Sequence, residues 1–152
     1  TLASRHWNER LAYVPQDSII IDASLRENIL LGHERSDEGD AFIIEILSRL
    51  RLKPLLDRLP EGVNTVLGEQ GVQLSGGERQ RIVLARAFFR HRDFIVLDEP
   101  TSALDNTTER EITEQIQALK GSKTMVIVSH RPDTIRYCDR IYEIKNRTVT
   151  CI

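Results

Sequence analysis

Three short apolar runs along this chain predict β-strands at residues 11–15, 94–98 and 124–129. Between the first two runs the spacing changes, and residues 24–90 predict a mostly helical segment. Its apolar residues recur at helical intervals, as in Phe42, Ile46 and Leu50. The run from Phe94 to Leu97 is continuous rather than alternating, which is typical of a strand covered on both faces. The pattern therefore predicts an α/β domain.

The second half of the chain carries clear start and stop signals. Asn106 and Glu109 have the spacing of a helix-capping pair, and Gly121 is expected to end that helix. A further helix is expected near residues 133–138. Residues 139–144 and 147–150 predict a closing hairpin, with its turn at Lys145–Asn146.

A serine followed by two glycines opens a helix expected to run from Glu78 to about Arg90. Ser75 and Glu78 have the spacing of a capping box, and Gly76 and Gly77 let another molecule approach the backbone. The free amides and the positive end of a helix favour an anion, above all phosphate. Taken alone, the same residues also describe an ordinary capped helix.

Two adjacent carboxylates, Asp98 and Glu99, end the central strand. Open α/β sheets bind ligands at the carboxyl ends of their strands. Mg²⁺ on Asp98 would offset the repulsion between the two charges and leave Glu99 to polarise a water. Taken alone, the pair could also be a solvated strand end.

Together these segments resemble the ATP-binding cassette (ABC) family over nearly the whole chain. The match consists of five motifs in the family's order. They are the Q-loop Tyr13–Asp17, the signature LSGGERQ at 74–80, the Walker B strand FIVLDEP at 94–100, the D-loop Ser102–Asp105, and the switch histidine of Ser129–His130. The resemblance implies a RecA-like, P-loop NTPase core of parallel strands with an inserted helical subdomain.

The resemblance also implies a role for each site residue. Gln16 and Asp98 would hold Mg²⁺, with Gln16 also contacting the attacking water. Glu99 would be the general base, and His130 would hydrogen-bond the γ-phosphate of ATP. The signature residues Ser75, Gly76, Gly77 and Glu78 would bind the ATP of a second cassette, and Asp105 would contact that partner.

Two further segments resemble ABC exporters. They are Ser24–Ile29 and the loop Asn64–Gly71, which in exporters touches the membrane domain. We therefore expect a transmembrane partner domain and a place at the cytoplasmic face of a membrane. The sequence has no apolar run near the ~18 residues that span a bilayer. Its net charge of −2 offers no basic surface for nucleic acid.

None of the eight glycines is followed by lysine, so the sequence has no P-loop motif. Because it also begins at Thr1, within the region leading to the first strand, we expect residues 1–152 to be a single incomplete ABC ATPase domain. Residues 24–90 would form the helical subdomain, and residues 11–23 and 91–152 the RecA-like core.

Such a chain is expected to be inactive alone and to be an ATPase within the full protein. Two alternatives stay open. The first is a short, non-hydrolysing module that docks on a complete cassette by its signature face. The second is a soluble ABC protein of translation or repair, which the exporter-like loop disfavours.

Overall fold

The computed structural model describes residues 10–31, 39–69 and 71–152. The expectation for the segment leading to the first strand therefore falls mostly outside the described residues, as does Gln70 of the loop 64–71.

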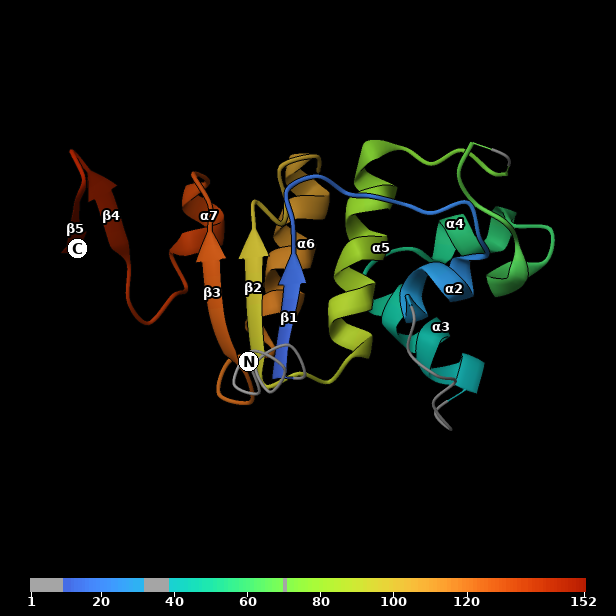
Figure 1. Ribbon diagram of the computed structural model, residues 1–152, viewed down its shortest axis with the longest axis horizontal. Helices are drawn as coiled ribbons and strands as arrows, with labels where there is room; N and C mark the ends of the chain where they lie inside the picture. Colours follow the sequence, from blue (N-terminus) through green and yellow to red (C-terminus); the bar gives the residue numbers. More distant parts are fainter. Residues whose placement is uncertain (1–9, 32–38, 70) are drawn as a thin grey trace, which may run out of the picture.

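The three predicted strands form one parallel sheet (Figure 1). They are β1 (Leu11–Val14), β2 (Phe94–Asp98) and β3 (Thr124–Val128), in the order β1-β2-β3. Phe94 lies opposite both Leu11 and Thr124, so the carboxyl ends of all three strands meet at one edge. The first strand stops one residue earlier than predicted because Pro15 has no N–H with which to continue the ladder.

The segment between β1 and β2 is mostly helical, as predicted. It contains α2 (Leu25–Leu30), α3 (Gly39–Arg49), α4 (Lys53–Arg58), the 3₁₀ turn η1 (Gly62–Asn64) and α5 (Gly76–Phe89). The long α5 packs against α2, α3 and β1, and thereby joins the helical part to the sheet (Figure 1). Its buried side chains include Ile82, Leu84 and Phe88, so the predicted burial of this helix is confirmed.

Only one face of the sheet is well covered in the described structure. Ala12, Val14, Ile95 and Leu97 are at most 2% exposed, and Figure 1 shows α5 and α6 (Asn106–Gln117) on that side. On the other face Phe94 and Val96 are half-buried. The prediction that this strand is covered on both faces is therefore wrong for the described residues.

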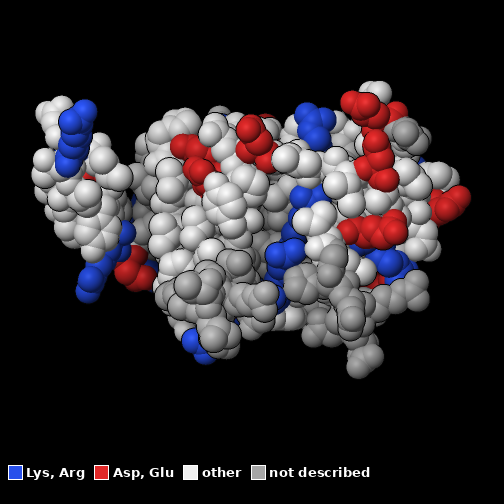
Figure 2. Space-filling model, viewed as in Figure 1, with Lys and Arg blue, Asp and Glu red and all other residues white. Residues whose placement is uncertain are grey.

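The uncovered face carries exposed apolar side chains. Tyr13, Val126 and Val128 are 54%, 46% and 52% exposed. In Figure 2 the described atoms in front of the upper part of the strands are largely uncharged, and acidic side chains lie above them, near the carboxyl ends of the strands. This face is thus an apolar surface bordered by carboxylates.

Two predictions about α6 are corrected. Its N-cap is Asp105 rather than Asn106, because the Asp105 carboxylate accepts hydrogen bonds from the amides of Thr107 and Thr108, each at 3.1 Å. The helix ends with Ala118 as its C-cap. Gly121, with φ +83°, lies in the turn beyond it.

The chain closes with α7 (Pro132–Ile135) and the hairpin β4 (Tyr142–Lys145) and β5 (Thr148–Cys151). The helix is shorter than expected. The hairpin turn lies at Asn146–Arg147 rather than Lys145–Asn146, with φ of 50° and 62°, because a tight primed turn needs both central residues left-handed. Among the described residues, no helix is long and apolar enough to cross a bilayer.

The apolar sheet face leads to a prediction for residues 1–152 expressed alone. We expect this polypeptide to aggregate or remain partly molten, because the face and the sheet edge can pair with other chains. Val126→Thr with Val128→Thr should raise the monomer fraction in size-exclusion chromatography. Ile44→Thr, on an equally exposed residue of α3, serves as the control. A soluble wild-type monomer with a sharp two-state melt would contradict this expectation.

Candidate functional site

The parallel strands bring four of the predicted site residues to one edge of the sheet. Gln16 follows β1, Asp98 ends β2 with Glu99 directly after it, and His130 follows β3. Glu99 and His130 are in direct contact, whereas no hydrogen bond joins the exposed Gln16 to either carboxylate among the described residues. The fold therefore assembles Glu99 and His130 as a pair and leaves Gln16 nearby.

Glu99 is held at three points. Its N–H donates to the Val128 carbonyl at 2.8 Å. One carboxylate oxygen, Oε1, accepts from the His130 N–H at 3.1 Å and lies 2.7 Å from His130 Nδ1. Its backbone is left-handed, with φ +47°, which costs about 1–3 kcal/mol in a residue with a side chain. Strain of this kind persists where the surroundings fix a side chain in place.

The second carboxylate oxygen of Glu99 is buried and has no hydrogen-bond partner within the described structure. The Glu99 side chain is 13% exposed, whereas the His130 side chain beside it is 79% exposed. An unpartnered buried oxygen is costly unless something binds it. A water or a substrate hydroxyl would satisfy it after a small movement of the side chain exposes this oxygen, which suits a general base.

Asp98 contacts Tyr13, whose hydroxyl donates to Asp98 Oδ2 at 3.2 Å. Partial desolvation, together with the nearby Asp98 carboxylate, raises the pKa of Tyr13, so this hydroxyl stays protonated as a donor. The described residues contain no group of three His, Cys, Asp or Glu side chains that could hold a metal alone. Mg²⁺ usually takes one or two carboxylates and completes its shell with phosphates and water. The side-chain types of Asp98 and Gln16 suit that partial role, and their assignment as metal ligands stays a prediction.

The predicted capping box at the start of α5 is confirmed. Ser75 Oγ accepts from the Glu78 N–H at 3.2 Å, and Glu78 Oε2 accepts from the Ser75 N–H at 2.8 Å. Arg58 donates to the other Glu78 oxygen at 2.8 Å. Burial favours the neutral acid, but the Ser75 hydrogen bonds and the Arg58 charge outweigh it and lower the pKa of Glu78. Both Glu78 oxygens are therefore engaged within the chain.

The two signature glycines pack against the D-loop. A Cβ on Gly77 would lie 3.2 Å from Leu104 Cδ2, whereas one on Gly76 would lie 3.7 Å from Ala103 Cβ. Gly77 therefore serves close packing inside the chain, and only Gly76 has ordinary room. Asp105, at the end of this loop, caps α6, and the hydrogen bonds from Thr108 lower the pKa of Asp105.

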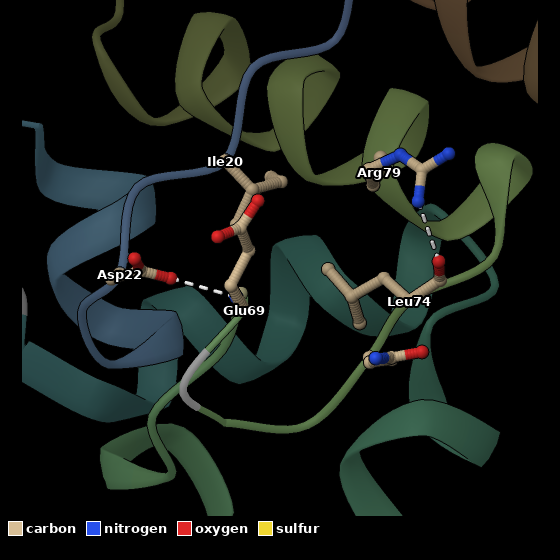
Figure 3. A pocket seen from close by; sticks show the side chains of 7 residues that line it. Ile20, Asp22, Glu69, Leu74 and Arg79 are labelled. Carbon is tan, nitrogen blue, oxygen red and sulfur yellow. Dashed lines mark hydrogen bonds between the residues drawn. The ribbon is translucent and has the colours of Figure 1, made fainter.

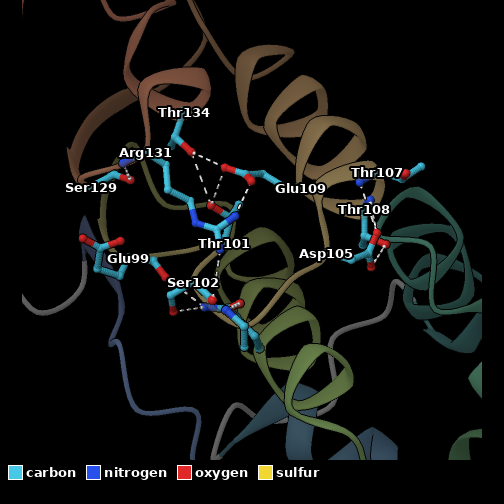
Figure 4. Close-up of polar contacts among 12 residues, drawn as sticks. Glu99, Thr101, Ser102, Asp105, Thr107, Thr108, Glu109, Ser129, Arg131 and Thr134 are labelled. Carbon is cyan, nitrogen blue, oxygen red and sulfur yellow. Dashed lines mark hydrogen bonds and ion pairs between the residues drawn. The ribbon is translucent and has the colours of Figure 1, made fainter.

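Sequence reasoning missed a buried polar cluster beside the switch histidine (Figure 4). Arg131 pairs with Glu109 of α6 and also donates to the Ser102 carbonyl at 3.2 Å. Thr101 and Thr134 hydrogen-bond the other Glu109 oxygen. The arginine next to His130 was the available signal, but its partner lies 22 residues away along the chain. The cluster ties the D-loop to the segment that carries His130.

A hollow of about 550 Å³ lies away from this edge, between the loop 64–71 and the start of α5 (Figure 3). Asp22, Glu69 and Arg79 line it. Asp22 Oδ1 accepts from the Glu69 N–H at 2.8 Å, and a Cβ on Gly68 would lie 2.1 Å from that oxygen. Gly68, at φ +104°, is thus required for this loop conformation.

The Glu109–Arg131 pair gives a stability prediction. The Glu109 side chain is 8% exposed and the Arg131 side chain 25%. In the complete polypeptide, Glu109→Gln should cost about 2–3 kcal/mol of unfolding free energy, below the full cost of breaking a buried pair because Arg131 retains some water. The control is Glu111→Gln, which breaks the exposed Arg51–Glu111 pair on the same helix and should cost less than about 1 kcal/mol. Equal losses of unfolding free energy for the two variants, measured by chemical denaturation, would contradict the prediction.

Comparison with known proteins agrees with the predicted fold and family. The family model described as ABC transporter matches residues 2–102. The solved structure of a bacterial Atm1-family ABC exporter with ATP bound superimposes with a TM-score of 0.79 and 32% identity. The match covers 89% of this chain and 24% of that one.

Two curated relatives are also similar. The chain is 34% identical over 149 residues to a multidrug resistance ABC transporter ATP-binding and permease protein of Lactococcus lactis subsp. lactis, covering 98% of this chain and 25% of that protein. It is 37% identical over 141 residues to an ATP-dependent lipid A-core flippase of Cupriavidus pinatubonensis, covering 92% of this chain and 24% of that protein. The chain thus spans about a quarter of the length of these relatives. Since the family model covers most of the chain, this protein belongs to the ABC transporter family, with the ATP-binding cassette fold of its exporters.

Proposed function

We propose that this chain is the C-terminal part of a cassette that couples ATP binding and hydrolysis to export or flipping of a substrate across a membrane. The observation that carries the proposal is the Glu99–His130 contact at the carboxyl edge, with one Glu99 oxygen left without a partner. In this proposal residues 24–90 form the helical subdomain, and residues 11–23 and 91–152 form part of the RecA-like core.

Each residue at the edge then has one task. Glu99 accepts the proton of the attacking water through its unpartnered oxygen once a small side-chain movement exposes it, while Oε1 keeps its contacts with His130. Because Nδ1 of His130 donates to the Glu99 carboxylate, the second nitrogen of this exposed ring donates to the γ-phosphate only in the form that carries a proton on both nitrogens. Asp98 and Gln16 hold Mg²⁺. The metal, when bound, supplies positive charge that neutralises the phosphates of ATP.

The signature end of α5 would serve the ATP of a second cassette. The Ser75 oxygen accepts the capping hydrogen bond from the Glu78 amide, so its hydroxyl proton remains free to donate to a phosphate. The helix start adds free amides and a positive dipole end at Gly76 and Gly77. Two cassettes, in a homodimer or a heterodimer, would therefore each complete the site of the other, with Asp105 at the contact.

The hollow beside the loop 64–71 supports a membrane partner. The side chains of Asp22, Glu69 and Arg79 present both signs of charge there. We propose that a transmembrane domain docks in this hollow and places the cassette at the cytoplasmic face. Relatives that share this segment are named as a multidrug resistance permease and a lipid A-core flippase.

The docking-module alternative has one observation in its favour, which is that the sequence contains no P-loop motif. A module of this kind would bind a complete cassette through Ser75–Gly77 and would hydrolyse nothing. The residues around Glu99 disfavour it, because docking alone needs no buried, unpartnered carboxylate oxygen.

The test of the proposed function is Glu99→Gln in the complete polypeptide. Removing the general base should lower ATP turnover at least about 100-fold and trap an ATP-bound dimer, because binding is retained while hydrolysis stops. Glu45→Gln, at an exposed position on α3, is the matched control and should leave turnover unchanged. Near-normal turnover of Glu99→Gln would refute the general-base role, and a wild type without turnover would favour the docking module.

A further inference from the structure

Gln80 is a buried polar residue on a helix whose other buried positions are nearly all apolar. It lies in the second turn of α5 and is 1% exposed. Burying an amide side chain costs free energy unless both its donor and its acceptor find partners. The partners of Gln80 therefore indicate what this residue is for.

In the described structure, the hydrogen-bond partners of the Gln80 side chain all lie on one loop, residues 99–103. Gln80 Nε2 donates to the Glu99 carbonyl at 2.8 Å and to Ser102 Oγ at 3.1 Å. Gln80 Oε1 accepts from the Ala103 N–H at 3.0 Å. The Gln80 side chain, on the signature helix, thus hydrogen-bonds both ends of the loop that joins Glu99 to the D-loop.

The contact with Glu99 is at the strained residue itself. The left-handed backbone of Glu99 directs its side chain toward His130, and only a few contacts maintain it. The N–H is tied to β3 and the side chain to His130. The Glu99 carbonyl accepts two hydrogen bonds. One comes from Gln80, and a longer one, at 3.2 Å, comes from the Ser102 N–H of the same loop. Gln80 therefore links the carbonyl of this strained residue to another element, the signature helix.

Gln80 and Ser75 lie five residues apart on one helix, and a helix of this length moves as a rigid body. We propose that Gln80 is a positioning residue that transmits displacement of the signature helix to the Glu99 peptide. This proposal rests on the proposed function, in which Ser75 touches the ATP of the partner cassette and Glu99 acts on the ATP of its own. Engagement of one site would then set the position of the base in the other.

Two substitutions remove the contacts. Gln80→Leu has a similar size and removes the donor and the acceptor. Gln80→Met also removes both, and its unbranched side chain keeps nearly the length of glutamine. The control is Thr113→Val in α6, which replaces another buried polar residue, one whose hydroxyl has no hydrogen-bond partner in the described structure.

The variants are made in the complete polypeptide and measured in two ways. Steady-state kinetics give kcat and KM for ATP. Hydrogen exchange of the peptide containing residues 99–104, followed in nucleotide-free protein, reports the Ala103 amide without any turnover. The melting temperature shows whether each variant folds.

We expect Gln80→Leu to lower kcat by about 10- to 100-fold, the range for a misplaced catalytic group, with KM within about threefold of wild type. The Ala103 amide should exchange faster. Gln80→Met should lower kcat similarly and also speed exchange of the Ala103 amide, and it carries the test alone if Gln80→Leu does not fold. Thr113→Val should change neither quantity.

Normal kcat in a folded Gln80→Leu or Gln80→Met variant would overturn the proposal, as would a rise in KM with kcat unchanged. The Glu99→Gln variant distinguishes an error in the positioning role of Gln80 from an error in the proposed function. If Glu99→Gln is inactive and Gln80→Leu is normal, only the positioning role of Gln80 is wrong. If Glu99→Gln is itself active, the general-base role of Glu99 is wrong.

Discussion

The left-handed peptide at Glu99 is the constraint on which the site depends. Three elements fix it, since β3 accepts its N–H, α5 contacts its carbonyl through Gln80, and the residue after β3 contacts its carboxylate. A free chain would relax such a peptide, because an L-residue with a side chain disfavours this conformation. The sheet and the signature helix together therefore hold the carboxylate at the edge where a nucleotide would bind.

Several features of this arrangement could be predicted because they are local in sequence. The capping box at Ser75 and Glu78 and the three strands each follow from residues within a few positions of one another. The parallel edge then follows from topology, and it places Asp98, Glu99 and His130 together. The division into subdomains and the roles of the site residues remain predictions and proposals.

Other features depend on residues distant in sequence, and local patterns did not reveal them. Gln80 looks like a surface glutamine until the loop 99–103 folds over it. Glu109 was expected to cap α6 with Asn106, but Asp105 makes the cap and Glu109 pairs with Arg131 instead. Strand β2, which is well covered on one face only, is a similar case. Its apolar run shows that both faces could be buried, but it does not show which elements cover them.

The central claim is that this chain contributes the base, the switch histidine and the signature of an ATP-driven exporter. The most direct measurement is the intact mass and the cell fraction of the native protein, combined with its ATP turnover. The account predicts an ATP-hydrolysing species several times larger than 17.4 kDa in the membrane fraction. A species near 17.4 kDa outside the membrane fraction, whether or not it hydrolyses ATP, would contradict the account.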